Sequence, residues 1–222
     1  MRRAGLKKGG RAALLMKGGI EWLLAFYACQ KLGVGLALIH LRLLPEEMLR
    51  MAALTGADTL ICSAEYLPQA EYIAEHSGRD FRMIVQGADE NAPDGAYSFE
   101  DLMRGENCSD AQAGMTGDEE SIILFTSGTT SAAKGVVRTQ RMMAAYASVL
   151  AGEEAQSAGD TMLTPAPLYH ATGICCVVKM LVGAGTLILL DHFDCEKVCA
   201  QVQKYRATQI ALVPPVSYQR LK

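Results

Sequence analysis

The residues best suited to chemistry lie in one short segment of the chain. Its first five positions hold four hydroxyls and a glycine, and a lysine and a second glycine follow: Thr126, Ser127, Gly128, Thr129, Thr130, Lys134 and Gly135. Backbone amides beside a glycine can approach an anion closely, hydroxyls donate hydrogen bonds to it, and a lysine adds a mobile positive charge. This combination favours the binding of a phosphate group. Composition alone leaves a second interpretation open, a Ser/Thr/Gly-rich turn with a solvated lysine.

The segment is not a Walker A loop. That motif places a glycine directly before its lysine, and a Ser or Thr that holds magnesium directly after it. Ala133 and Gly135 occupy these two positions here. A phosphate site in this segment therefore follows a different pattern.

The flanking sequence predicts an α/β fold of layered, mostly parallel sheets with flanking helices. Short apolar runs predict strands at 34–39, 58–62, 81–85, 121–125, 161–164, 186–190 and 208–213. Helical patterns lie at 20–32, 45–55, 66–76, 139–151 and 172–182, and Asp194 is expected to cap another helix. Strands that alternate with helices are typical of βαβ units. Residues 126–135 are then a loop between a strand and a helix.

Charge is distributed unevenly along the chain. The first 17 residues contain six bases and no acid, and residues 87–120 contain ten acids and only Arg104 as a base. Charge runs of this kind usually lie on a solvated surface. Residues 87–120 also contain several glycines and a proline with weak periodicity, so we expect an acidic surface connector with one short helix at 99–103.

Composition excludes several classes of protein. Half of the 222 residues are apolar and the net charge is −3, which argues against disorder and gives no support to a nucleic-acid partner. The longest apolar region, 22–41, is interrupted by Gln30, Lys31 and Gly33, so we do not expect insertion in a membrane. The basic start lacks a signal core, and the expected location is the cytoplasm.

The seven cysteines include no Cys-x-x-Cys pair. Cys29 and Cys62 fall within apolar runs, which predicts buried free thiols in a reducing compartment. His192, Cys195 and Cys199 are possible metal ligands, but the two cysteines share the apolar spacing of one helix with Val198, Val202 and Tyr205. We therefore predict core packing and no metal site.

The hydroxyl-rich segment resembles the phosphate loop of the adenylate-forming superfamily, which comprises acyl-CoA synthetases, luciferases and the adenylation domains of peptide synthetases. Their signature reads Thr-Ser-Gly-Thr-Thr-Gly-x-Pro-Lys-Gly, often followed by Thr-His. The seven residues given above match in order and spacing. The departures are Ser131 for the second glycine, Ala133 for the proline and Gln140 for the histidine. Where a glycine has positive φ, serine costs on the order of 1 kcal/mol, so weaker nucleotide binding is expected.

The resemblance covers nearly the whole chain. Residues 5–15 are similar to the family's Gly-Val-Lys-Lys-Gly-Asp-Arg stretch, with Gly10 in place of the aspartate, and residues 41–47 are similar to its next turn. Residues 165–173 resemble the family's Pro-Leu-Phe-His-x-x-Gly segment. The match implies that Tyr169, His170 and Gly173 line the pocket for the acyl group. Without it, a lone histidine such as His170 is more often a structural residue.

The resemblance implies a function and a domain organisation. Residues 1–222 would form an incomplete large N-terminal domain, an AMP-binding domain whose C-terminal part and small C-terminal domain are absent. ATP, carried with Mg²⁺, would activate a carboxylic acid as an acyl-adenylate, and coenzyme A or a carrier-protein thiol would accept the acyl group. We find no complete catalytic set and expect this chain alone to be inactive as an acyl-CoA ligase. The alternatives are an adenylation module that loads a carrier protein, or a non-catalytic remnant that binds a nucleotide or a partner.

Overall fold

The computed structural model describes residues 1–88, 92–104, 114–126 and 133–213. It divides into two compact units. The first contains residues 1–16 and 20–141, and the second contains residues 17–19 and 142–222.

The first unit is built on a seven-stranded sheet in the order β5-β4-β3-β1-β2-β6-β7. The strands are β1 (Arg11–Leu15), β2 (Gly35–Leu38), β3 (Thr59–Ser63), β4 (Arg82–Gln86), β5 (Tyr97–Ser98), β6 (Glu120–Thr126) and β7 (Lys134–Thr139). Every neighbouring pair is parallel except β6 with β7. The expected mostly parallel α/β architecture is therefore confirmed.

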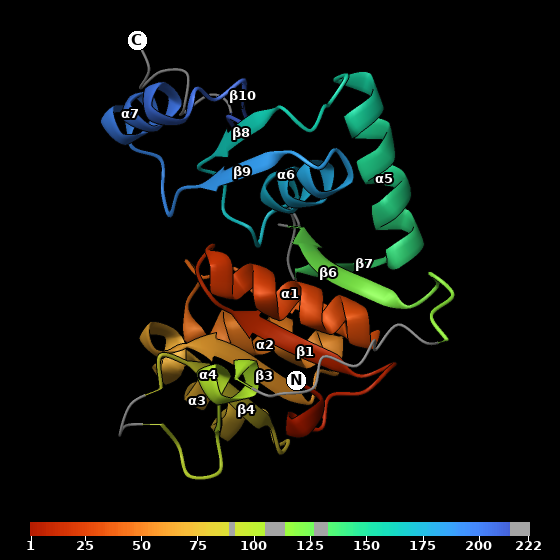
Figure 1. Cartoon of the computed structure of the whole chain (residues 1–222). Helices are drawn as coiled ribbons and strands as arrows, with labels where there is room; N and C mark the ends of the chain where they lie inside the picture. Colours follow the sequence, from red (N-terminus) through yellow and green to blue (C-terminus); the bar gives the residue numbers. More distant parts are fainter. Residues whose placement is uncertain (89–91, 105–113, 127–132, 214–222) are drawn as a thin grey trace. The chain divides into compact units, whose positions relative to one another are not determined.

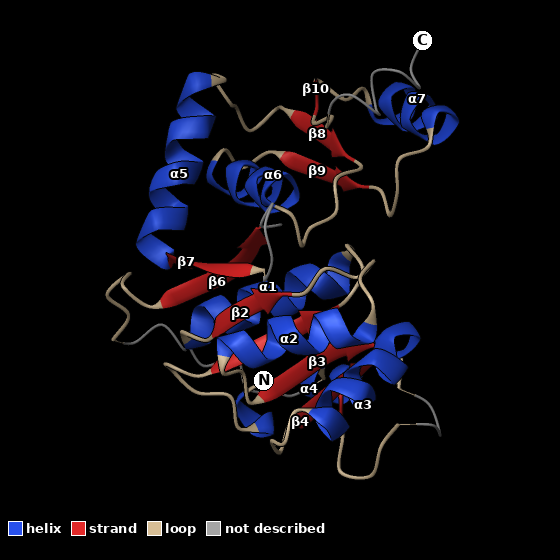
Figure 2. Ribbon diagram, turned by 180° about the vertical axis from the view of Figure 1, so that it is seen from behind, coloured by secondary structure: helices blue, strands red, loops and turns tan. Residues whose placement is uncertain are grey.

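Helices cover both faces of this sheet (Figures 1 and 2), with α1 (Ile20–Leu32) on one face and α2 (Pro45–Thr55) and α3 (Leu67–His76) on the other. The remaining helical segments of the unit are the short η1 (Arg2–Ala4), η2 (Ala64–Tyr66) and α4 (Phe99–Met103). Because both faces are covered, β2 and β3 are buried at every residue. This burial explains why the strands appear in the sequence as continuous apolar runs rather than alternating ones.

Local sequence fixes the ends of α2. Pro45 opens the helix, where its missing N–H costs nothing, and the Glu47 carboxylate accepts a hydrogen bond from the Leu44 amide at 3.2 Å. Gly56 ends the helix in the left-handed conformation at φ 67°. The bounds are those that the sequence predicts.

The second unit contains a smaller, three-stranded parallel sheet in the order β10-β8-β9. Its strands are β8 (Thr161–Thr164), β9 (Thr186–Leu189) and β10 (Gln209–Ile210), and its helices are α5 (Gln140–Glu153), α6 (Ala171–Val182) and α7 (Cys195–Tyr205). The first two residues of α5 belong to the first unit. In α6, Lys179 is buried, pairs with Glu154 and donates to Gln209 Oε1 at 2.6 Å, which satisfies its charge inside the unit.

Several expectations need correction. The segment 126–135 is not all loop, because Lys134–Thr139 forms strand β7, and the following helix begins at Gln140. Strand β10 is two residues long, against the expected 208–213. The expected connector contributes β5 to the sheet, whereas its expected short helix at 99–103 is confirmed as α4, with Phe99 buried. The helix capped by Asp194 is present, since its carboxylate accepts from the Lys197 amide at 2.8 Å.

The cysteines behave in two ways. Cys29 and Cys62 are fully buried free thiols, as expected, and burial raises the pKa of each to about 12. The prediction that the stripe on α7 packs in the core is wrong for Cys199 and Tyr205, which are exposed, whereas Val198 is buried. Only part of the stripe is therefore covered by the rest of the second unit.

Two absences can be stated for the described ranges. No helix within them is both long and apolar enough to cross a membrane. Within the same ranges, no three His, Cys, Asp or Glu side chains come together in a way that would hold a metal ion.

Candidate phosphate and substrate site

The hydroxyl-rich segment connects two strands that pair in an antiparallel manner, and only its two ends are described. Strand β6 ends at Thr126 and β7 begins at Lys134, and these two residues are direct partners across the hairpin. Phe125 and Gly135 form the next pair. Ser127, Gly128, Thr129 and Thr130, which complete the predicted phosphate-binding set, lie outside the described residues. The structure thus brings together Thr126, Lys134 and Gly135 of the predicted set.

The sheet places Thr126 and Lys134 at one edge of the first unit. Strand β6 runs parallel to β2, with Leu36 opposite Ile122 and Ala37 opposite Ile123. Thr126 is therefore at the edge where the carboxyl ends of the parallel strands meet. Ligands of open α/β sheets bind at this edge, because the loops that follow the strands gather there.

A side chain at Gly135 would crowd the hairpin. A Cβ at this position would lie 3.1 Å from Cγ2 of Ile123 on the neighbouring strand. Ile123 is itself buried in the core cluster beneath the sheet, so it has little room to move. Ala133, which stands where the family signature has proline, is partly buried against the same cluster. Lys134, between the two, is exposed. The backbone around the lysine is thus fixed while its side chain is accessible.

The predicted pocket residues lie in the second unit, after the carboxyl end of β8. The chain turns at Pro167, whose carbonyl accepts a hydrogen bond from the His170 amide at 3.1 Å. Tyr169 is buried, and His170 is exposed in extended conformation as the N-cap residue of α6. The two rings lie 4.8 Å apart at 48°. The turn therefore holds both side chains next to each other at the start of a helix.

Gly173 allows this turn to pack against α6. A Cβ at residue 173 would lie 2.2 Å from the Pro167 carbonyl oxygen and 2.9 Å from the Leu168 Cα, closer than atoms can approach. The space next to Gly173 is thus filled by the backbone of the turn. Its contribution to the predicted pocket is to hold Tyr169 and His170 close to α6.

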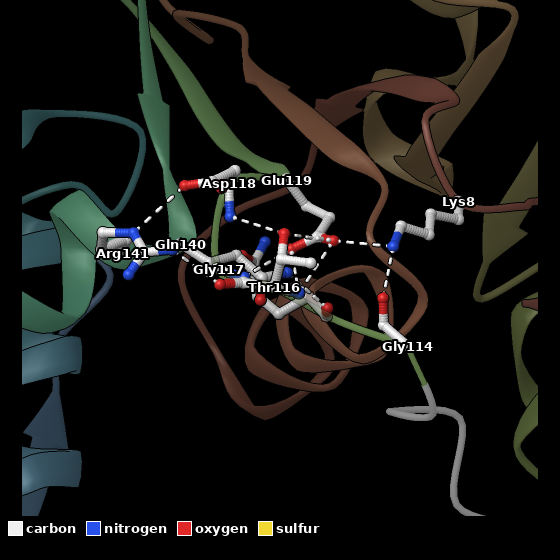
Figure 3. A network of polar contacts seen from close by, with 9 residues as sticks. Lys8, Gly114, Thr116, Gly117, Asp118, Glu119, Gln140 and Arg141 are labelled. Carbon is white, nitrogen blue, oxygen red and sulfur yellow. Dashed lines mark hydrogen bonds and ion pairs between the residues drawn. The ribbon is translucent and has the colours of Figure 1, made fainter.

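A polar network that the sequence did not predict holds the other end of the hairpin (Figure 3). Lys8 lies 2.8 Å from Glu119 Oε1, and Glu119 also accepts from the backbone amides of Thr116 and Gly117. The hydrogen bond from Lys8, with these amides, lowers the pKa of Glu119 to about 2. Arg141 at the start of α5 pairs with Asp118 at 3.1 Å.

Arg11 of β1 extends the contacts at this end. Its guanidinium binds both carboxylate oxygens of Glu120, at 2.6 and 2.5 Å, and donates to the Thr55 carbonyl at 2.7 Å. The bidentate geometry is the strongest form of such a pair, and the hydrogen bond with Glu120 raises the pKa of Arg11. Lys8 is exposed, as expected for a solvated surface, but that interpretation is wrong for the Glu119 side chain, which is 6% exposed. Arg11 and Glu120 are partly buried, so the basic start of the chain pairs with the end of the acidic stretch. The opposite charges of the two runs could have indicated this pairing. Because the runs lie about 110 residues apart in the sequence, no local pattern identifies the partners.

Magnesium is the one metal that the chemistry implies. The groups that Thr126, Lys134 and Gly135 supply are hydroxyl, amide and ammonium groups, which suit an anion rather than Mg²⁺. Any Mg²⁺ at this edge would therefore be carried by the phosphates themselves.

Comparison with known proteins agrees with this architecture. The family model described as AMP-binding enzyme matches residues 1–221. The crotonobetaine/carnitine–CoA ligase of Escherichia fergusonii is 30% identical over 213 residues, which cover 95% of this chain and 41% of the ligase. The chain thus spans about two fifths of the length of this curated relative.

Solved structures give the same result. The inhibitor-bound N-terminal domain of FACL13 from Mycobacterium tuberculosis matches with a TM-score of 0.87 and 26% identity, over 99% of this chain and 53% of that one. ATP-bound MatB from Rhodopseudomonas palustris has the same fold, with a TM-score of 0.84 and 24% identity, over 99% of this chain and 42% of MatB.

Proposed function

The chain belongs to the AMP-binding enzyme family, and on that premise we propose that it forms the part of an acid–thiol ligase that holds the ATP phosphates. In the proposed reaction a substrate carboxylate attacks the α-phosphorus of ATP, which yields an acyl-adenylate and releases pyrophosphate. A thiol then attacks the acyl carbon and AMP leaves. The relatives are CoA ligases, which favours coenzyme A over a carrier protein as the thiol. The proposed location is the cytoplasm.

The proposed roles follow the two candidate segments. Thr126, Ser127, Gly128, Thr129, Thr130, Lys134 and Gly135 would hold the β- and γ-phosphates, which become the pyrophosphate. Lys134 would neutralise negative charge as the α–β bond breaks, a stabilisation that grows towards the transition state. Tyr169 and His170 would shape the carboxylic-acid pocket, with Gly173 setting their place on α6.

One observation carries this proposal. Lys134 is paired with Thr126 across the hairpin and is exposed at the carboxyl edge of the parallel sheet. A solvated lysine in an unstructured turn would have no such fixed backbone. Because the hairpin already fixes the backbone of Lys134, little conformational entropy of the chain is lost when its ammonium group binds an anion.

The test is binding of pyrophosphate and of ATP to the purified chain by isothermal titration calorimetry. Lys134→Ala is expected to weaken pyrophosphate binding roughly tenfold, since a charge-assisted hydrogen bond is lost. Lys31→Ala is the matched control, because Lys31 is an exposed lysine of the same unit in the last turn of α1. If the two variants lost pyrophosphate affinity equally, the hairpin would not bind the phosphates and the proposed function would be wrong.

A further inference from the structure

The hairpin that carries Lys134 contains an irregularity near its other end. Glu120 pairs with Thr139, but the next pair is Ile122 with Arg138, so two steps along β6 match one step along β7. Ser121 is the additional residue of a β-bulge. A bulge leaves its extra residue out of the ladder and fixes the register of all pairs beyond it. Here those pairs run from Ile122 to Thr126.

The side chain of Gln30 on α1 binds this bulged residue at two points. Its amide nitrogen donates to the Ser121 carbonyl at 3.1 Å, and its amide oxygen accepts from the Ser121 hydroxyl at 2.6 Å. Ser121 is buried, so its polar groups need partners inside the protein. Because the carbonyl can only accept, the orientation of the Gln30 amide follows from the pairing itself.

Gln140 ties the other strand of the hairpin to the same place. Its side-chain amide donates to the Gln30 carbonyl at 2.7 Å, and its backbone amide donates to the Glu119 carbonyl at 2.9 Å. Gln140 is the residue that stands where the family signature has histidine. The structure therefore gives a role to this departure, because the glutamine joins the start of α5 to the helix that holds the bulge.

The two valines of β7 specify its register only weakly. Val136 and Val137 point to opposite faces of this edge strand and are 42% and 43% exposed. In a strand with one buried face, a slip by one residue would expose apolar side chains and would be penalised, but here the two faces are nearly equivalent. The register that places Lys134 opposite Thr126 must therefore be determined by other contacts.

We propose that the hydrogen-bonded set Gln30, Ser121 and Gln140 is a register lock for the phosphate-binding hairpin. Gln30 and Gln140 are then positioning residues for Lys134. They act through the strands, because Ser121 lies five residues before Thr126, about 17 Å along the strand. This inference rests on the proposed function for its effect on phosphate binding, but the lock itself is a property of the hairpin.

The test is a double-mutant cycle between Gln30 and Lys134. Gln30→Met keeps the length of the side chain and removes both bonds to Ser121, and it is expected to weaken pyrophosphate binding roughly three- to tenfold. In the Gln30→Met background, Lys134→Ala should weaken pyrophosphate binding little further, because a misplaced ammonium group already interacts only weakly with the anion. Residues this far apart normally contribute independently, so losses that multiply would refute the lock.

Two further variants separate positioning from general loss of stability. Ser121→Ala removes the hydroxyl bond but keeps the bond to the carbonyl, so it should weaken pyrophosphate binding less than Gln30→Met does. Ser121→Thr, which keeps the hydroxyl, should retain the wild-type affinity. Ser98→Ala is the control, since the Ser98 hydroxyl caps α4 by accepting a hydrogen bond from the Asp101 amide at 3.2 Å. This variant should leave the affinity for pyrophosphate unchanged. If Gln30→Met prevents folding, Ser121→Ala takes its place in the cycle.

Amide hydrogen exchange tests the lock without any ligand. In Gln30→Met, the amides of residues 134–139 should exchange at least severalfold faster than in the wild type, while those of β1 and β3 stay protected. Unchanged exchange in β7 would overturn the lock even if pyrophosphate binds as proposed. Faster exchange in a chain whose Lys134→Ala variant binds pyrophosphate normally would support the lock and overturn the proposed function.

Discussion

Replacing Gly173 by alanine should distort the turn that presents Tyr169 and His170. The new Cβ would lie 2.2 Å from the Pro167 oxygen and 2.7 Å from the Pro167 carbonyl carbon, so the turn or the start of α6 must move by about 1 Å. Both obstructing atoms belong to the backbone, which cannot change rotamer. Overpacking of this kind costs up to about 3 kcal/mol, and alanine returns about 1 kcal/mol through helix propensity. The expected net destabilisation is about 2 kcal/mol.

Urea denaturation followed by far-UV circular dichroism measures this loss. For a slope of about 2 kcal/mol per molar urea, the midpoint should fall by about 1 M. The matched control is Gly152→Ala in α5 of the same unit, where a Cβ would have no heavy atom within 4 Å. That variant should raise the midpoint by up to about 0.5 M through helix propensity alone. If both variants shift the midpoint upwards, the close approach at Gly173 does not constrain the turn and the reasoning is wrong.

Two further predictions follow from the buried and paired ionisable groups. The pKa of the Glu119 carboxyl is lowered from 4.5 to about 2, so its stabilising contribution is complete above about pH 5 and is lost as the pH falls towards 2. Glu119→Gln should lower the urea midpoint at pH 7 and should make the midpoint fall less steeply between pH 5 and pH 2. A fall as steep as that of the wild type would contradict the assignment. At pH 8 only about one in ten thousand of the Cys29 and Cys62 thiols is ionised. A thiol reagent, with the labelled sites identified by peptide mapping, should therefore label exposed Cys199 first and the two buried cysteines only in urea. Early labelling of Cys29 would mean that α1 opens in the native state.

The sequence predicted most elements because their ends carry strong local signals. Pro45 and Gly56 define α2, and Asp194 defines the start of α7 through a side-chain cap. Continuous apolar runs identified the buried parallel strands, which need no alternation because both faces are covered. These signals act over a few residues and survive any change in tertiary context.

Strand β7 was missed because its signal depends on its neighbour. Residues 134–139 begin with Lys134 and Gly135, which favour a loop, and only Val136 and Val137 suggest a strand. The segment becomes a strand by pairing with β6, whose edge would otherwise be unpaired on that side. Likewise, Gly173 was identified from the motif, but its physical reason, the approach of Pro167, depends on a turn whose geometry no local pattern defines.

The departures from the family signature bear on whether the motif is maintained or decaying. Ser131 lies outside the described residues, but the other two departures can be judged. Ala133 is partly buried against the core cluster, so the loss of proline leaves no gap there. Gln140 donates to Gln30, and Gln30 in turn satisfies both polar groups of Ser121. A decaying motif would be expected to leave buried donors and acceptors unpaired, because each substitution removes one partner at a time. Here Gln140 and Ala133 are incorporated into the hydrogen bonding and packing of the hairpin, which is the behaviour expected of the phosphate site that we propose.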